Sequence, residues 1–278
     1  MVTLSRREAA DLLARHGLQP QRSLSQNFVV DPNTVRRIAR LAGVGPGDRV
    51  VEVGAGLGSL TLALLETGAE VTAVEIDRRL LPVLDEVVVP AGARVVHGDA
   101  LRLDWSTLLG EEPWVLVANL PYHVATPLVA DLLDEVPAVQ RMLVMVQREV
   151  GERMVAGVGN PAYGALSVKV AYWARASLAG RVPATVFLPR PEVESALVSI
   201  ERRPAPAVDP AEVGFDELFA LVRAGFGQRR KMLRRSLAGL VDAEGFACAG
   251  VRPEARAEEL DVAAWGRLAA CSRRVSPA

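Results

Sequence analysis

The sequence Val51-Glu52-Val53-Gly54-Ala55-Gly56-Leu57-Gly58 decides the fold class of this chain. A short apolar run ends in spaced glycines, and a segment with helical periodicity follows. Glycines at a strand-to-helix turn let the backbone turn tightly and let a ligand approach without meeting a side chain. In open parallel sheets, ligands bind past the carboxyl ends of the strands. We therefore predict a strand that ends beside a ligand site bordered by Gly54 and Gly56.

The segments on both sides of this turn alternate between strand and helix patterns. Such alternation predicts a parallel sheet covered by helices on both faces. The fold class is thus α/β, a Rossmann-like sheet, preceded by helices at residues 3–16 and from Asp31-Pro32 onward. Strands are predicted at residues 49–53, 70–74, 94–97, 114–118, 141–146 and 197–200, and helices at 57–67, 78–87, 126–133 and from 147 through 154.

A proline-rich stretch at residues 203–210 divides the chain. Pro204, Pro206 and Pro210 stand among small residues, a composition typical of a linker. Beyond it, helices are predicted at residues 215–226, 229–240 and 262–270. We predict two domains: residues 1–205 form the sheet domain that carries the ligand site, and residues 206–278 form a smaller all-helical domain.

Composition limits the class of protein. The chain has 278 residues, of which 50% are hydrophobic, enough for two apolar cores. It shows no apolar run long enough to span a membrane and no signal-peptide pattern at its start. Its two cysteines, Cys248 and Cys271, are far apart and outside any CxxC pattern, which we interpret as evidence for a reducing compartment and against a disulfide framework or a zinc site. We expect a soluble cytoplasmic protein without a metal.

Charge is distributed unevenly although the net charge is only −1. Residues 51–140 are strongly acidic, whereas the segments before and after them, residues 1–50 and 141–205, are basic. Such a pattern is typical of a two-faced surface that steers a polyanion to one side. It fits an arginine-rich composition scattered over a solvated surface equally well.

Three acids in register indicate the ligand. Glu52 precedes the glycines, Glu75 ends the next strand and Asp99 follows the third. Glu75 can accept hydrogen bonds from both hydroxyls of a ribose, which fits a nicotinamide dinucleotide or S-adenosylmethionine. Asp99 can accept a hydrogen bond from an adenine amino group. Glu52 and Asp99 favour the methyltransferase version of the fold. We therefore predict S-adenosylmethionine as the cofactor, against the simpler interpretation of a glycine turn with surface acids.

Asn119-Leu120-Pro121-Tyr122 follows the fourth strand directly. The Asn119 carbonyl and a neighbouring backbone carbonyl can accept the two protons of an exocyclic amine, which directs its lone pair at a methyl group. Pro121 fixes the backbone, and Tyr122 offers a ring face on which a base can stack. Phe187, in a proline-rich loop, either closes this pocket from the other side or packs under the loop. The motif predicts methylation of a base amine.

Residues 227–235 contain five cations and no acid. We predict a helix on which Met232, Leu233 and Leu237 face the core while Arg230 and Arg234 project outward. Contacts of this kind with phosphates give affinity without sequence information. A solvated helix face is the plainer interpretation, but the acid-free run favours RNA. The predicted RNA-binding residues are Arg223, Arg229, Arg230, Lys231, Arg234 and Arg235.

Together these motifs resemble the family of small-subunit (16S) ribosomal RNA adenine dimethyltransferases, whose loss in bacteria gives kasugamycin resistance. The resemblance covers about residues 22–268. It is carried by residues 25–29, 52–56, 119–122, 146–150, 163–167, 187–195 and 226–231.

This resemblance implies the substrate and the site. The substrate would be two adjacent adenosines near the 3′ end of small-subunit RNA, each receiving two methyl groups, in a partly assembled 30S subunit. We expect a monomer. Asn119, Leu120, Pro121, Tyr122 and Phe187 would hold the adenine. S-adenosylmethionine would be held by Gln26, Asn27, Val29, Gly54, Gly56, Glu75, Ile76, Asp99, Ala100 and Asn119.

Three departures from the family pattern bear on alternatives. Ser25 replaces the usual glycine, His123 an asparagine and Ala125 a serine. Ser-Gln-Asn-Phe also occurs in the related macrolide-resistance methylases of large-subunit RNA, but residues 163–167 and 226–231 resemble the small-subunit family. An assembly factor that acts mainly by binding need not keep the Asn119 motif. A nicotinamide-dependent oxidoreductase would need a hydride-transfer acid or base, and none is evident.

Overall fold

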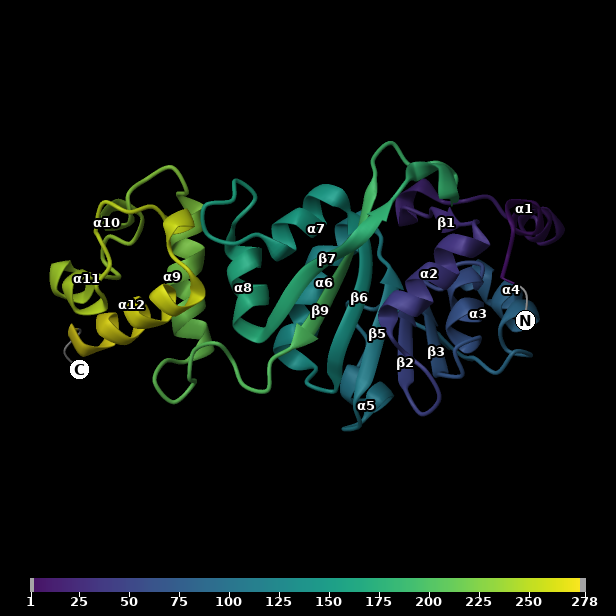
Figure 1. Cartoon of the computed structure of the whole chain (residues 1–278), viewed down its shortest axis with the longest axis horizontal. Coiled ribbons are helices and arrows are strands. Elements are labelled where there is room, and N and C mark those ends of the chain that lie inside the picture. The colour runs from purple at the N-terminus through teal and green to yellow at the C-terminus, as the bar shows by residue number, and fades with distance from the viewer. Residues whose placement is uncertain (1–2, 276–278) are drawn as a thin grey trace. The chain divides into compact units, whose positions relative to one another are not determined.

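The computed structural model describes residues 3–275, apart from the side chains of Arg22, Tyr122, His123 and residues 273–275. Its main element is a seven-stranded sheet with the strand order β4-β3-β2-β5-β6-β9-β7 (Figure 1). The first five strands in this order, from β4 to β6, are parallel to one another, and β9 is antiparallel to β6. The predicted α/β class is confirmed. The strands are β2 Arg49–Val53, β3 Glu70–Glu75, β4 Arg94–His97, β5 Trp114–Asn119, β6 Val139–Gln147, β7 Ala174–Val182 and β9 Ser195–Arg202.

Helices cover the sheet because each buries an apolar stripe. Helix α2 begins at Asp31, whose side chain accepts from the Thr34 amide at 2.8 Å, and it buries Val35 and Ile38. Helices α2 and α3 pack on β2, β5 and β6, while α1 and α4 pack beside β3. No helix in the described range is both long and apolar enough to cross a membrane. The first helices are α1 Arg6–Arg15, α2 Pro32–Ala42, α3 Ser59–Leu65, α4 Leu81–Val87, α5 Trp105–Leu109, α6 Tyr122–Glu135 and α7 Arg148–Val155.

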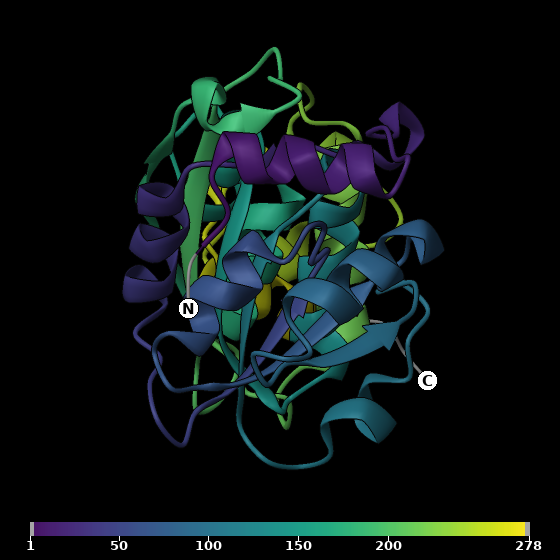
Figure 2. The ribbon, with the colours of Figure 1, turned by 90° about the vertical axis from the view of Figure 1, so that its right-hand side faces the viewer.

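A second, two-stranded sheet joins distant parts of the sequence. Strand β1 (Phe28–Val29) pairs antiparallel with β8 (Phe187–Leu188), with Val29 opposite Phe187. The sequence analysis did not predict this pairing. Helix α1 lies across the side of the molecule that faces the viewer in Figure 2, and Arg6 donates to the carbonyl oxygens of Thr185 and Phe187. The N-terminal segment is thereby attached to the loop before β9.

The chain forms two compact units. Unit 1 comprises Met1–Gly151 and Ser177–Arg202, and unit 2 comprises Glu152–Ala176 and Arg203–Ala278. The passage into unit 2 at Arg203 lies close to the boundary predicted at residue 205. Unit 2 also includes residues 152–176, which the sequence analysis assigned to the sheet domain. This segment contains helix α8 (Ala165–Trp173), which was not predicted.

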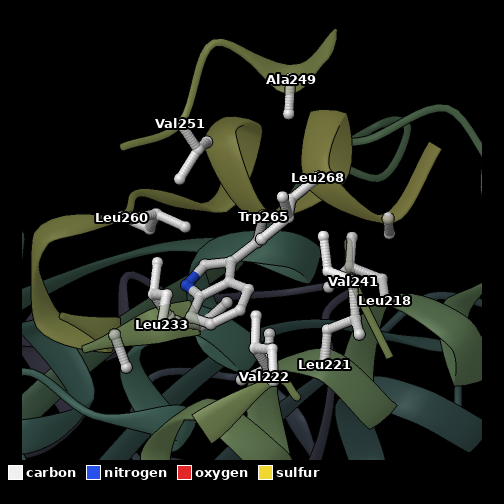
Figure 3. Packing of buried hydrophobic residues seen from close by; sticks show 14 of the residues in the cluster. Leu218, Leu221, Val222, Leu233, Val241, Ala249, Val251, Leu260, Trp265 and Leu268 are labelled. Carbon is white, nitrogen blue, oxygen red and sulfur yellow. The ribbon is translucent and has the colours of Figure 1, made fainter. Parts of the chain in front are cut away.

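Unit 2 is built around Trp265, which is fully buried (Figure 3). Its ring packs among Val222, Leu233 and Leu260. A Cβ atom at Gly225 would lie 2.6 Å from the Trp265 ring, so only glycine lets α9 approach α12 this closely. The helices of this core are α8, α9 Phe215–Gly227, α10 Leu233–Ser236, α11 Ala243–Ala249 and α12 Val262–Val275.

Two sequence-based interpretations in unit 2 are wrong. Cys248 on α11 and Cys271 on α12 form a disulfide, with their Cα atoms 5.8 Å apart, because the two helices pack side by side. The sequence spacing gave no sign of this contact. The predicted helix at residues 229–240 is the short α10 preceded by a turn, and Met232, which was expected in the core, is exposed. Leu233 and Leu237 are buried as predicted.

Candidate active site

A cavity lies at the carboxyl ends of β2, β3 and β5 in unit 1, where the sequence analysis placed the ligand site. The polypeptide segments around it come from the glycine turn after β2, the end of β5, the segment before β1 and the Phe187 loop. Its polar lining includes Ser25, Gln26, Asn27, Glu52, Ser59, Glu75, Asn119 and Ser195, and its apolar lining includes Leu4, Ala9, Val29, Leu57, Ile76, Leu120, Met145 and Phe187.

The glycine turn forms one wall. Gly54 and Gly56 have φ angles of +77° and +60°, a region that side chains other than glycine rarely adopt. A Cβ atom at Gly56 would lie 2.9 Å from the Phe28 ring. The turn therefore requires glycine both for its backbone conformation and for the approach of β1.

Glu75 connects this turn to the end of β3. Its side chain is buried and accepts from the backbone amides of Gly56 at 2.8 Å and Asp77 at 2.9 Å. Burial raises the pKa of Glu75, and the two amide donors act in the opposite direction. A carboxylate has about four acceptor positions, so two remain for ligand hydroxyls after these bonds.

Asn119 is oriented by the N-terminal segment. Its Nδ2 donates to the carbonyl oxygen of Asn27 at 3.1 Å, and the side-chain Nδ2 of Asn27 in turn donates to the carbonyl oxygen of Ser25 at 3.0 Å. Because the amide nitrogen is engaged in this way, Oδ1 is the atom of Asn119 available as an acceptor in the cavity. The following Leu120 is fixed by its amide, which donates to Met145.

Phe187 packs under the loop and also lines the cavity, whereas its contact with a base stays a prediction. It is 2% exposed and belongs to the apolar core under the loop, and it also lines the cavity. Pairing with Val29 holds it there. The ring is thus a rigid part of the wall.

Comparison with known proteins gives the class of this site. The family model for ribosomal RNA adenine dimethylase matches residues 17–272. The chain belongs to this family. It is therefore an enzyme, a methyltransferase of ribosomal RNA adenine.

Individual relatives of this dimethylase agree. A protein of Kineococcus radiotolerans named ribosomal RNA small subunit methyltransferase A is 50% identical, over 96% of this chain and 91% of its own length. A protein of the same name from Leifsonia xyli subsp. xyli is 51% identical, over 95% and 96%. The solved structure of the 23S rRNA methyltransferase ErmE is similar with a TM-score of 0.71 and 25% identity, covering 89% of this chain and 100% of that one.

Most of the predicted cofactor residues of the dimethylase lie at the cavity, but two do not. Asp99 and Ala100 are absent from its lining; Asp99 accepts from the Leu101 amide at 3.0 Å and pairs with Arg102 at 3.6 Å. The side chain of Tyr122 lies outside the described residues, and its backbone begins α6. The predicted residues brought together are Gln26, Asn27, Val29, Gly54, Gly56, Glu75, Ile76, Asn119, Leu120, Pro121 and Phe187.

Several lining residues were missed by the sequence analysis. Leu4 and Ala9 come from the segment around the start of α1, and Ser59 is the first residue of α3. The apolar face of α1 was visible in the sequence, but nothing showed that this helix would lie over the cavity. Ser59 directly follows the last glycine of the turn, and that position was the available signal.

The cationic segment of unit 2 is partly neutralised. Arg229 forms an ion pair with Glu258 at 2.7 Å, and Arg234 pairs with Glu254 at 3.4 Å. The sequence showed no acid nearby because both glutamates come from a later part of the chain. Within residues 3–275, no ion pair or hydrogen bond engages the exposed side chains of Arg223, Arg230, Lys231 or Arg235.

Proposed function

We propose that this dimethylase transfers methyl groups from S-adenosylmethionine to N6 of two adjacent adenosines near the 3′ end of small-subunit ribosomal RNA. Each adenosine receives two methyl groups, and the substrate is a partly assembled 30S subunit in the cytoplasm. The relatives at about half identity, named small subunit methyltransferase A, support this choice of RNA. The observation that carries the proposal is the orientation of Asn119 beside the glycine turn.

The cavity residues fit the proposed donor. Gly54 and Gly56 form a cradle that side chains would fill, and the two free acceptor positions of Glu75 suit a ribose. Ser59 Oγ is buried without a hydrogen-bond partner among the described residues, as expected of a group that awaits a ligand. The donor, when bound, supplies an electrophilic methyl group on a sulfonium. We propose contacts from Gln26, Asn27, Val29, Gly54, Gly56, Glu75, Ile76, Asp99, Ala100 and Asn119.

Asn119 prepares the acceptor. Its Oδ1 and a neighbouring backbone carbonyl accept the two protons of the adenine amine, so the nitrogen lone pair turns toward the methyl group. Pro121 stiffens this strand end, and Phe187 and Tyr122 hold the flipped base between ring faces. The chemistry needs positioning rather than a strong base, because the proton can leave after the transfer.

Unit 2 contributes affinity for the RNA backbone. Arg223, Arg230, Lys231 and Arg235 are exposed cations available to phosphates. Arg229 and Arg234 must first lose their ion pairs with glutamates, so we propose that they contribute less to the affinity for RNA. The enzyme acts as a monomer in this proposal.

The test is methyl transfer to unmethylated subunits. Protein is incubated with tritiated S-adenosylmethionine and with 30S or 50S subunits from cells that lack the gene, and dimethyladenosine is mapped in the RNA. We expect label in the 3′ region of the 30S RNA alone. Label in the 50S RNA would instead indicate the large-subunit activity, and binding to 30S without label would indicate an assembly factor.

A further inference from the structure

Ser195 carries a buried hydroxyl that the proposed mechanism does not use. It is the first residue of β9, is 3% exposed and lines the cavity. Its side chain makes no hydrogen bond within the described residues. The backbone of Ser195 is paired with Gln147 of β6, so the sheet fixes the position of the side chain. A hydroxyl that is enclosed in this way and has no partner in the protein is available to a ligand in the cavity.

The order of the strands places Ser195 on the acceptor side of the cavity. The strands run β3-β2-β5-β6-β9 (Figure 1), so Glu75 and the glycine turn lie on one side of Asn119, which ends β5. Ser195 lies on the other side, two strands beyond Asn119, and at the same edge of the sheet because β9 is antiparallel to β6. Two strand spacings amount to about 10 Å. Since the proposed donor occupies the side of β2 and β3, a ligand between Asn119 and Ser195 is the base that receives the methyl group.

This side of the cavity is otherwise apolar. The lining residues that follow β5 in the chain are, besides Ser195, Leu120, Pro121, Met145 and Phe187. An adenine ring can pack against such side chains, but its ring nitrogens are hydrogen-bond acceptors that lose water when the base enters. A serine hydroxyl can donate one hydrogen bond to such a nitrogen. Within the described part of this lining, Ser195 has the one side chain able to do so.

We propose that Ser195 binds the target adenine by donating a hydrogen bond to one of its ring nitrogens, and that the second methyl transfer to each base depends on this bond more than the first. The inference rests on the proposed function, and it names a further residue that recognises the base at the same site. Ser195 is thus a binding residue for the acceptor and takes no part in binding the donor.

The two transfers differ in the hydrogen bonds that the amine can make. Each transfer forms a bond between N6 and the methyl carbon, breaks the bond from that carbon to sulfur, which keeps the electron pair, and releases one amine proton to solvent. Adenine begins the first transfer with two amine protons, one for Asn119 Oδ1 and one for a neighbouring backbone carbonyl. Monomethyladenine begins the second transfer with only one. A ring nitrogen keeps its lone pair throughout, so the share of Ser195 in orienting the base increases as that of the amine decreases.

The test is a time course of methyl transfer to unmethylated 30S subunits with the full chain in excess. The RNA is digested, and monomethyladenosine and dimethyladenosine are quantified for the wild type and Ser195→Ala. Loss of one neutral hydrogen bond changes a rate by about 2- to 10-fold. We expect the first transfer to slow about twofold and the second about tenfold, so that monomethyladenosine accumulates. Affinity for S-adenosylmethionine, measured by titration calorimetry, should be unchanged, because Ser195 lies away from the donor side.

Two further variants separate a bond to the base from a structural role. Ser199→Ala is the matched control, because Ser199 lies on the same face of β9 but does not line the cavity, and its product ratio should equal that of the wild type. Ser195→Cys keeps the shape with a weaker donor and should give an intermediate ratio. Ser195→Ala should be as stable as the wild type in urea, because the protein itself loses no hydrogen bond. A clear loss of stability would mean that the hydroxyl serves the fold, which contradicts the proposal.

Base analogues identify the nitrogen that Ser195 contacts. Small-subunit RNA is assembled with a synthetic 3′ segment in which 1-deaza-, 3-deaza- or 7-deazaadenosine replaces the target adenosines, so that a CH group replaces one ring nitrogen at a time. One analogue should make the wild type accumulate the monomethyl product, and Ser195→Ala should have no further effect on that analogue. A variant that slows all three analogues as much as it slows adenosine would show that Ser195 contacts no ring nitrogen.

The outcomes separate this inference from the proposed function. If the wild type forms dimethyladenosine in 30S RNA and Ser195→Ala gives the same ratio of products, the inference is wrong and the proposed function stands. Equal slowing of both transfers would likewise contradict the inference alone. If the wild type methylates no adenosine in 30S RNA, the proposed function fails and this inference fails with it.

Discussion

The glycine turn of unit 1 and the cationic segment of unit 2 are both short motifs that stand out in the sequence. The glycine turn has the structure that its sequence predicts, whereas the cationic segment differs from its predicted helix. Gly54 and Gly56 lie at the cavity with the conformations that the motif requires. Residues 229–235 form a turn and a short helix, and two of their cations are paired with glutamates.

The difference reflects the range of the forces involved. A glycine motif fixes backbone torsions, and torsions are decided within a few residues. The partner of a cationic side chain is not determined locally, since it can come from any segment that the fold brings close. Glu254 and Glu258 come from a later segment of the chain, and Glu258 is 29 residues beyond its partner Arg229. A charge run therefore predicts a surface less reliably than a glycine run predicts a turn.

The largest expected effect concerns Asn119, on the locally determined side of the comparison. We predict that Asn119→Ala lowers the rate of methyl transfer about 10³-fold, because the carboxamide that accepts an amine proton in the proposed arrangement is lost. Tritium incorporation into unmethylated 30S subunits measures it. Asn33→Ala, an exposed substitution on α2, is the control and should be silent. Near-normal turnover in Asn119→Ala would contradict the proposed role of Asn119 in binding the acceptor amine.

Unit 2 depends on a second long-range contact, the disulfide. Cys248 and Cys271 are 23 residues apart, and closing a loop of this length contributes about 3 kcal/mol to the free energy of unfolding. We predict that the double variant Cys248→Ser/Cys271→Ser loses about this much in urea unfolding without reductant. Adding reductant should lower the wild type to the level of the variant. Equal stability of oxidised wild type and variant would show that the bridge is dispensable.

The cations of this segment fall into two sets, those that are paired with glutamates and those that are not. We predict that replacing Arg230, Lys231 and Arg235 by Ala weakens binding to 30S subunits about 10- to 100-fold and flattens the dependence of log K on log salt by about two units. Replacing the paired Arg229 and Arg234 should change both quantities much less. Equal effects of the two sets would mean that RNA displaces the glutamate partners when it binds. The paired and unpaired cations would then contribute alike.

Much of the fold could be predicted because its elements are periodic. The strands of the parallel sheet and helices such as α2 and α9 were located from apolar spacing and caps. Strand β7 and helix α8 were missed; β7 alternates too weakly, with a largely exposed surface, and the amphipathic signal of α8 is weak because it is apolar on nearly all sides. The membership of residues 152–176 in unit 2 depends on packing against later helices, which no local pattern encodes.

The site divides in the same way. Residues fixed by strand ends, Glu75 and Asn119, lie where the sequence placed them. The pairing of β1 with β8 was not foreseen, because each strand has only two residues, too few to show an alternating pattern in the sequence. The burial of Glu52, which raises its pKa, was likewise invisible, since the sequence shows the carboxyl but not what surrounds it.

The smallest predicted effect measures how strictly the glycine turn is determined. Gly56 and Gly47 both have positive φ angles, +60° and +88°, but a Cβ atom at Gly47 would meet nothing within 4 Å, whereas at Gly56 it would meet the Phe28 ring at 2.9 Å. Gly47→Ala should therefore cost only the backbone strain, about 1 kcal/mol in urea unfolding, and Gly56→Ala about 1–2 kcal/mol more because the ring must move. Since Phe28 belongs to β1, the extra loss should be accompanied by weaker donor binding. Equal losses at the two positions would mean that β1 shifts freely, and that the turn is set by its torsions alone rather than by the strand packed against it.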